Sequence, residues 1–139
     1  MDILNTILLV DDDDTTNLLN KYFAEAIDDT IDVVTAVNGL EALQFLENSD
    51  IEAIGPCLII LDVMMPIMDG WEFLELFNQR FDAKFKEQVT ISILTGLDAN
   101  KIAKKAKENP LVQDTVEKPL SDEKFRALIG KHYAEKLSQ

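Results

Sequence analysis

Short apolar segments and segments of helical periodicity alternate along the whole chain, and no other feature constrains its fold as strongly. An apolar run of four or five residues between polar or turn-forming residues is typical of a buried strand. Strands that are each followed by a helix are expected to run parallel. The expected strands are residues 7–10, 32–37, 57–61, 89–94 and 111–116. The sequence therefore predicts an α/β fold, a three-layer αβα sandwich around a five-stranded parallel sheet.

The composition of the expected strands predicts their order in the sheet. Strands that are covered on both faces are almost continuously apolar, as segments 7–10, 57–61 and 89–94 are. Segments 32–37 and 111–116 contain polar residues and are expected at the edges. The resulting order, 2-1-3-4-5, is the flavodoxin-like arrangement. Its ligands bind at the carboxyl ends of the strands, beside the switch between strands 1 and 3.

Capping residues mark the starts of the expected helices, because a short polar side chain there accepts a hydrogen bond from the first turn. These residues are Asn38, which Glu41 follows as in a capping box, Asp69, Asp98 and Ser121. The helix before them has an apolar face that is expected to pack on the sheet. This face consists of Leu18, Leu19, Tyr22, Phe23, Ala26 and Ile27.

The charge and the cysteine content argue against several classes of protein. With 13 Lys and Arg against 26 Asp and Glu, the net charge is −13, which disfavours nucleic-acid binding. No apolar run approaches the ~20 residues of a membrane span, and the N-terminus is not signal-like. A single cysteine, Cys57, excludes an internal disulfide and fits a reducing compartment. We therefore expect a cytoplasmic protein without nucleic-acid or membrane partners, in which residues 1–139 form one domain with no output domain.

Polar side chains from separate segments are expected to meet at the carboxyl edge of the sheet. Asp11 and Asp12 follow the first strand, Asp62 the third, Thr95 the fourth and Lys118 the fifth. Three neighbouring carboxylates repel one another unless a cation lies among them, and Mg²⁺ binds such oxygens together with phosphate. A carboxylate in such a site can act as a nucleophile towards phosphorus. The set predicts phosphoryl transfer to Asp62, with a lysine and a hydroxyl to bind phosphoryl oxygens.

Other polar residues have ordinary structural explanations. Asp13 and Asp14 suit the cap and the acidic first turn of a helix. His132, the only histidine, is expected to be structural or exposed and far from the site. Cys57 is expected to be a small core residue.

Four motifs together resemble the receiver domain of two-component response regulators, the CheY-like family. They are ILLVDD at residues 7–12, LDVMMPIMDG at 61–70, LTG at 94–96 and EKP at 117–119. They occur in the order of the family and cover essentially the whole chain. The resemblance implies that Asp62 becomes an aspartyl phosphate, with a histidine kinase or a histidine phosphotransfer protein as the donor. The phosphorylated domain would then signal to a downstream protein or pass the phosphate on in a phosphorelay.

The resemblance also assigns roles to the other site residues. Thr95 and Lys118 would bind the phosphoryl group, and the Lys118–Pro119 peptide bond is expected to be cis. The implied Mg²⁺ ligands are the side chains of Asp11, Asp12 and Asp62 and the main-chain carbonyl of Met64.

The sequence departs from the family where output and phosphate lifetime are concerned. Three residues before the site lysine the family commonly has Tyr or Phe, but here the residue is Thr115, so the usual aromatic switch is missing. Met64 and Leu97 would flank the path of the attacking water, and neither can orient it, which predicts slow self-dephosphorylation. Output is expected to pass through the loop after Thr95 and the helix that follows. Two interpretations of the lysines on this helix, Lys101, Lys104, Lys105 and Lys107, stay open. They only solvate an exposed helix, or an acidic partner meets one of them on the face formed by this helix, the fifth strand and the last helix.

Two other interpretations fit parts of the sequence. Asp11-x-Asp13-x-Thr15 is similar to the first motif of haloacid-dehalogenase-like phosphatases, which use the first Asp as the nucleophile. That family requires a later acidic pair and leaves Asp62 unexplained. The other interpretation is a degenerate receiver that binds a partner without being phosphorylated. A phosphatase would turn over a generic phosphomonoester, whereas a receiver is not an enzyme beyond its own phosphorylation and dephosphorylation.

Overall fold

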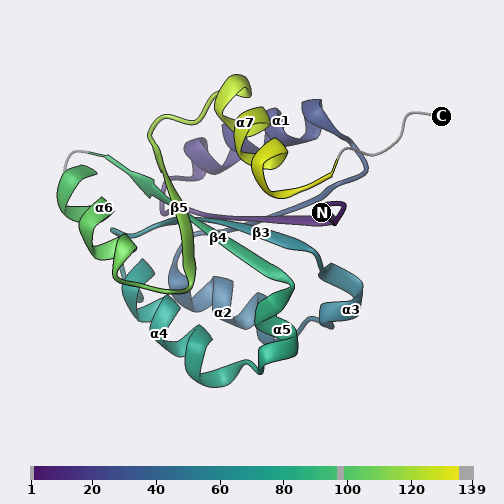
Figure 1. The fold of residues 1–139 in the computed structure, drawn as a ribbon. Helices are drawn as coiled ribbons and strands as arrows, with labels where there is room; N and C mark the ends of the chain where they lie inside the picture. The colour runs from purple at the N-terminus through teal and green to yellow at the C-terminus, as the bar shows by residue number, and fades with distance from the viewer. Residues whose placement is uncertain (1, 97–98, 135–139) are drawn as a thin grey trace.

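A five-stranded parallel sheet forms the centre of the computed structural model, which describes residues 2–96 and 99–134 (Figure 1). The strands are β1 (Thr6–Val10), β2 (Asp32–Ala36), β3 (Cys57–Asp62), β4 (Val89–Thr95) and β5 (Val112–Glu117). Their order is β2-β1-β3-β4-β5, which confirms the flavodoxin-like topology and both expected edge strands. Each strand begins and ends within one residue of its expected bounds.

Helices cover both faces of this sheet. The helices of the described residues are α1 (Asp14–Ile27), α2 (Gly39–Glu47), α3 (Ile51–Ile54), α4 (Gly70–Arg80), α5 (Ala83–Glu87), α6 (Ala99–Lys107) and α7 (Asp122–His132). Helices α1 and α7 lie on one face, α2, α4 and α5 lie on the other, and α6 lies beside β5 (Figure 1). The short helices α3 and α5 are not among the expected ones, and they begin at the N-caps Asp50 and Asp82. No helix in the described ranges is long and apolar enough to cross a membrane.

The central strands are buried on both faces, as their continuous apolar sequence predicts. Every residue of β1 and β3 is buried. Alternate side chains point to opposite faces, so Leu8 and Ile59 join the core beneath α2 and α4, whereas Ile7 and Ile60 join the core beneath α1 and α7. Replacing a fully buried side chain such as that of Phe73 by alanine costs about 3–5 kcal/mol. The two cores therefore fix the strand ends that carry the polar residues.

Helix α1 packs through a different face from the one its apolar residues predict. Leu18 and Tyr22 are 70% and 66% exposed, and Leu19 and Ala26 are also exposed. The side chains that face the sheet include those of Asn17, Asn20 and Ala24. The cause is a pair of hydrogen bonds, because the Nδ2 of Asn17 donates to the carbonyls of Asp11 at 2.8 Å and Ala36 at 3.1 Å. These bonds tie the helix to the ends of β1 and β2 and leave Leu18, Leu19 and Tyr22 exposed, whereas Phe23 and Ile27 pack against the core beneath α1 and α7.

The expected caps account for the starts of three other helices. The side chain of Asn38 accepts a hydrogen bond from the amide of Glu41 at 2.8 Å, and Asp69 and Ser121 cap α4 and α7 in the same way. Asp98, the expected cap of α6, lies outside the described residues. The Lys118–Pro119 peptide bond is cis, as expected.

Candidate functional site

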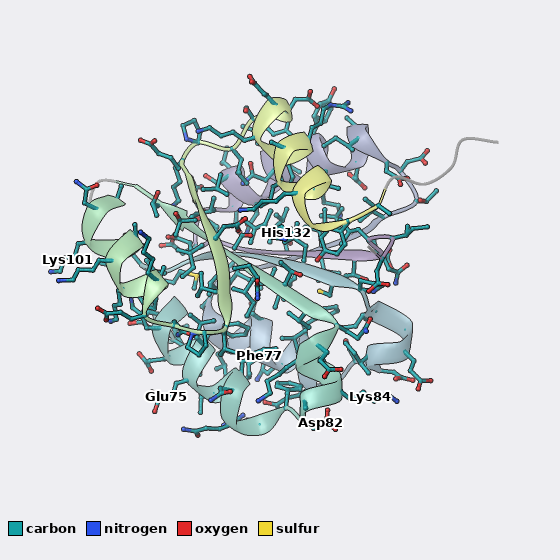
Figure 2. The ribbon with its side chains drawn as sticks, viewed as in Figure 1. Glu75, Phe77, Asp82, Lys84, Lys101 and His132 are labelled. Atoms are coloured by element: carbon teal, nitrogen blue, oxygen red, sulfur yellow. The ribbon has the colours of Figure 1, made fainter. Side chains whose placement is uncertain are left out.

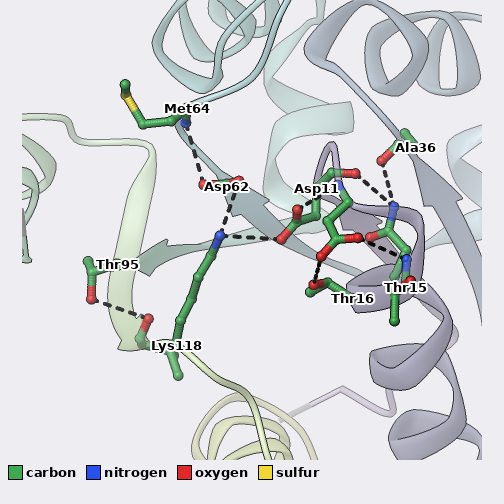
Figure 3. A network of polar contacts seen from close by, with 11 residues as sticks. Asp11, Thr15, Thr16, Ala36, Asp62, Met64, Thr95 and Lys118 are labelled. Atoms are coloured by element: carbon green, nitrogen blue, oxygen red, sulfur yellow. Dashed lines mark hydrogen bonds and ion pairs between the residues drawn. The ribbon is translucent and has the colours of Figure 1, made fainter. Parts of the chain in front are cut away.

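The polar residues that the sequence places at the strand ends meet in one cluster (Figure 3). Carboxylate oxygens of Asp11, Asp12 and Asp62 lie within 4.8 Å of one another. The ammonium of Lys118 lies 3.2 Å from the Oδ2 of Asp62 and 3.4 Å from the Oδ2 of Asp11. Asp62 and Asp11 are buried, whereas Asp12 is exposed. The cluster thus contains two buried carboxylates, those of Asp11 and Asp62, with the Lys118 ammonium in contact with both. The third carboxylate, that of Asp12, is accessible to solvent.

Strand register and a glycine position the two buried carboxylates. Val10 of β1 pairs with Leu61 of β3, so Asp11 and Asp62 follow at the same level of the sheet. The amide of Gly70, at the start of α4, donates to the carbonyl of Val63 at 3.0 Å. A Cβ atom at Gly70 would lie 2.8 Å from the carbonyl oxygen of Asp62, so only glycine allows this close approach.

Asp11 has an unsatisfied oxygen at the centre of the cluster. Its Oδ1 accepts a hydrogen bond from the amide of Asp13 at 3.0 Å, but its buried Oδ2 accepts none. Burial raises the pKa of the Asp11 carboxyl, and the Asp13 amide and the Lys118 ammonium offset this only in part. A buried carboxylate oxygen that has only an ammonium 3.4 Å away, next to two further carboxylates, fits a hard cation such as Mg²⁺.

Lys118 neutralises part of this negative charge. Burial by itself would lower the pKa of its ammonium, but the carboxylates of Asp62 and Asp11 outweigh burial and hold the pKa above its ordinary value. The backbone amide of Lys118 donates to the carbonyl of Thr95 at 2.8 Å, which fixes the strand end that carries it. Lys118 therefore remains a cation next to Asp62 at neutral pH.

Thr95 and Met64 lie on either side of Asp62 in the cluster (Figure 3). The buried Thr95 hydroxyl points to the sheet, where it donates to the carbonyl of Val116 at 3.5 Å. The amide of Met64 contacts the Oδ1 of Asp62 at 3.4 Å, and its side chain is 74% exposed. The expected role of the Met64 carbonyl as a metal ligand stays a prediction. Leu97, the second residue of the expected water path, lies outside the described residues.

Asn17 is a positioning residue that the sequence interpretation missed. Its bond to the carbonyl of Asp11 anchors the segment between β1 and α1. A signal for it exists, since Asn17, Asn20 and Ala24 recur at helical spacing, but two of these residues are polar and suggest a solvent-facing side. Asp13 acts as expected, because its side chain accepts from the amide of Thr15 at 3.1 Å and caps α1.

The comparison with known families agrees with this geometry. The sequence model described as "Response regulator receiver domain" matches residues 7–130. The chain belongs to the response regulator receiver family. Receivers are not enzymes in the usual sense, and this membership replaces the interpretation of the chain as a haloacid-dehalogenase-like phosphatase.

Relatives of known name include a kinase and a regulator. The chain is 33% identical to "Hybrid signal transduction histidine kinase D" of Dictyostelium discoideum over 123 residues, 88% of this chain and 7% of that protein. It is 26% identical to "Probable C4-dicarboxylate response regulator DctR" of Priestia megaterium over 136 residues, 96% of this chain and 55% of that protein. This receiver therefore spans little more than half of the regulator and a small part of the kinase.

A solved structure confirms the similarity in three dimensions. The "Two component response regulator from Cytophaga hutchinsonii" is 28% identical to this receiver, with a TM-score of 0.76. The match covers 93% of this chain and 96% of that one. Sequence and structure thus place the chain in the same family.

Proposed function

We propose that this receiver accepts a phosphoryl group on Asp62 from a phosphohistidine in a histidine kinase or phosphotransfer protein. The observation that carries the proposal is that the Lys118 ammonium is shared between two buried carboxylates, and that the Oδ2 of Asp11 has no partner besides this ammonium, 3.4 Å away. One ammonium therefore balances only part of the charge of the three clustered carboxylates. The cluster thus fits further positive charge beside a candidate nucleophile.

The proposed reaction assigns a role to each side chain. An oxygen of Asp62 forms a bond to phosphorus as the N–P bond of the donor breaks, and the histidine nitrogen keeps the electron pair. Lys118 offsets the charge of the phosphoryl oxygens as a point charge, as phosphoryl transfer depends mainly on positioning and electrostatics. The Thr95 hydroxyl would leave the Val116 carbonyl to donate to a phosphoryl oxygen.

The proposal includes a Mg²⁺ ion. The side chains of Asp11, Asp12 and Asp62 and the main-chain carbonyl of Met64 would hold it. When bound, the ion would supply positive charge that lowers the repulsion between Asp62 and the incoming phosphoryl group. A cytoplasmic location also belongs to the proposal, and the absence of a second cysteine beside Cys57 supports it.

The phosphorylated form is proposed to signal through α6 and β5. Among the described residues of α6 only Ala106 is buried, so few core contacts hold the helix in place. Thr115 of β5 is exposed and lies beside a shallow cavity of about 280 Å³ that Ala103 and Ala106 also line. No aromatic ring is available at Thr115, so the change would pass through the loop after Thr95. An acidic downstream partner would meet the exposed lysines of α6, which are Lys101, Lys104, Lys105 and Lys107.

Intact mass after incubation with acetyl phosphate tests the proposed acceptor. The expected result is an adduct of one phosphoryl group that forms with Mg²⁺, disappears with EDTA and is absent from Asp62→Asn. An adduct that persists in Asp62→Asn, or that ignores EDTA, would contradict the proposal. A degenerate receiver would give no adduct under any of these conditions.

Slow loss of the phosphate is a second part of the proposal. The exposed thioether of Met64 offers no strong hydrogen bond to an attacking water. Phosphate-affinity gels of the purified phosphoprotein should therefore show faster decay in Met64→Asn than in the wild type. Equal decay rates of the two phosphoproteins would show that the Met64 side chain does not slow dephosphorylation.

A further inference from the structure

Ile67 has the most unusual backbone conformation of the described residues. Its φ of 69° makes it the one non-glycine residue with positive φ in residues 2–96 and 99–134. The amide of Met68 donates to the carbonyl of Pro66 at 2.7 Å, which closes a three-residue γ-turn centred on Ile67. A γ-turn with positive φ is rare and strained. A β-branched side chain such as that of isoleucine tolerates this region poorly.

The side chain of Ile67 does not offset this strain by packing. It is 76% exposed, so most of its apolar surface remains in water. Asparagine or glycine would adopt the same conformation more easily, and asparagine would also suit the exposed position. Isoleucine thus destabilises the free domain through both strain and exposure. A contact with a partner would account for its presence, because backbone strain of this kind concentrates at functional sites.

Other exposed apolar side chains lie on segments that start at the same edge of the sheet. Three residues separate the end of β1 from the start of α1, and the amide of Gly39 at the start of α2 donates to the carbonyl of Met68 at 2.8 Å. The large exposed apolar side chains of these segments and of the loop between β3 and α4 are Leu18, Leu19, Tyr22, Leu40, Met64 and Ile67. Within the described residues the remaining one, Ile3, lies before β1 at the opposite end of that strand.

We propose that Ile67, together with Met64, anchors the protein that donates the phosphoryl group, so that Ile67 determines the efficiency of transfer without contacting phosphorus. The inference rests on the proposed function, since it takes Asp62 as the acceptor. Reacting atoms must come within about 3–3.5 Å, so a protein donor has to cover the loop that starts at Asp62. Asp12 and Asp13, which follow β1, are exposed. The partner therefore carries an apolar surface beside its phosphohistidine, with basic groups opposite these acids.

Two phosphoryl donors of different size distinguish binding of the partner protein from phosphoryl transfer itself. Acetyl phosphate reaches Asp62 without touching Ile67. The protein probes are the histidine kinases and phosphotransfer proteins of the organism that encodes this chain, phosphorylated from ATP, and the fastest donor for the wild type is used. Ile67→Asn should melt at the same or a higher temperature and react normally with acetyl phosphate. Its kcat/KM with the protein donor should fall by about tenfold, mainly through KM.

Matched variants complete the test. Ile67→Val keeps the apolar branched side chain and should retain transfer from the protein donor. Ile3→Asn, at the distant exposed isoleucine, should also leave that transfer unchanged. Normal protein transfer to Ile67→Asn would overturn the inference, as would a wild type that no protein donor labels faster than acetyl phosphate does. Loss of both reactions in Ile67→Asn would also overturn it. Failure of acetyl phosphate to label Asp62 in the wild type would instead count against the proposed function.

Discussion

Two aspartates of the same sheet, Asp11 and Asp114, are both withdrawn from water, yet their surroundings shift their pKa values in opposite directions. The side chains of Asp11 and Asp114 are 3% and 13% exposed. The pKa of the Asp11 carboxyl is raised, because burial outweighs its few stabilising contacts. Burial would also raise the pKa of Asp114, but hydrogen bonds from Ser92, His132 and Lys131 together lower it.

The partners of Asp114 come from three different elements. The hydroxyl of the fully buried Ser92 on β4 donates to its Oδ1. Its Oδ2 lies 2.9 Å from the Nε2 of His132 and 3.2 Å from the Nζ of Lys131, both on α7. Figure 2 shows His132 on the side of α7 that faces the sheet. The carboxylate thus joins β4, β5 and α7. His132, which the sequence predicts to be structural or exposed, has a structural role.

The difference between the two carboxylates is one of hydrogen bonding, and Asp11 is the one that belongs to the candidate site. Both oxygens of Asp114 have donors, so its charge strengthens the fold. The Oδ2 of Asp11 accepts no hydrogen bond and has only the Lys118 ammonium 3.4 Å away, so the cost of burying its charge exceeds the stabilisation from its contacts. Burial alone therefore does not distinguish the two carboxylates, whereas the number of hydrogen-bond donors around each does.

The largest effect is expected from removing the Asp114 carboxylate. Asp114→Ala would leave the hydroxyl of Ser92 buried without a partner and would release His132 from β5. We expect a loss of about 2–3 kcal/mol, because unsatisfied buried groups and broken networks are costly. This corresponds to a melting temperature roughly 5–10 °C lower. The losses of unfolding free energy in Ser92→Ala and Asp114→Ala should be strongly non-additive in the double variant. Additive losses would contradict the proposed network.

Asp11→Asn is expected to raise the free energy of unfolding, whereas Asp114→Ala lowers it. It keeps the shape of the side chain and removes a charge that burial disfavours. Without Mg²⁺ the variant should therefore be more stable than the wild type, by about 1 kcal/mol. The stabilisation that Mg²⁺ gives the wild type should vanish in the variant, because a ligand is lost. Thermal melts with Mg²⁺ and with EDTA measure both effects, and an unchanged Mg²⁺ response would contradict the role of Asp11.

The sequence predicts the sheet and the site for a common physical reason. Mostly apolar runs identify β1, β3 and β4 because both faces of a central parallel strand must be buried. Parallel strands then bring their carboxyl ends to one edge, so Asp11, Asp62, Thr95 and Lys118 could be grouped without coordinates. Family membership confirms the fold and the receiver function, and the roles of individual site residues stay predictions.

Three features could not be predicted, because each depends on contacts between distant residues. The orientation of α1 follows from Asn17 bonding to the carbonyl of Ala36, nineteen residues away. The sequence around Asp114 predicts only an ordinary polar residue of an edge strand. Its partner Ser92 lies 22 residues earlier in the chain. The conformation of Ile67 contradicts the preference of isoleucine, so local propensity gives the wrong answer there.

Acid should reveal the opposite pKa shifts of the two aspartates. A lowered pKa contributes stability that is present at neutral pH and is lost as the pH falls below about 4. The stability difference between the wild type and Asp114→Asn should therefore shrink in acid. A raised pKa means that protonation relieves the buried charge, so the advantage of Asp11→Asn should appear only as the pH rises above about 4. Urea unfolding between about pH 3.5 and 7 without Mg²⁺ measures both differences, and curves that run in parallel would contradict the opposite shifts.

The smallest effect is expected from Lys131→Met, which tests whether burial or charge gives the Asp114 network its strength. The side chain of Lys131 is 60% exposed, whereas that of His132 is 17% exposed, and both bond to the same oxygen of Asp114. An exposed ion pair contributes little, because water screens it and ordering a lysine costs entropy. We expect Lys131→Met to change the unfolding free energy by less than about 0.5 kcal/mol. His132→Ala should cost about 1–2 kcal/mol, since it removes a largely buried partner together with its packing. If urea unfolding finds the two variants equal, or Lys131→Met the more damaging, then long-range charge rather than the satisfied hydrogen bonds stabilises Asp114, and the contrast with Asp11 needs another explanation.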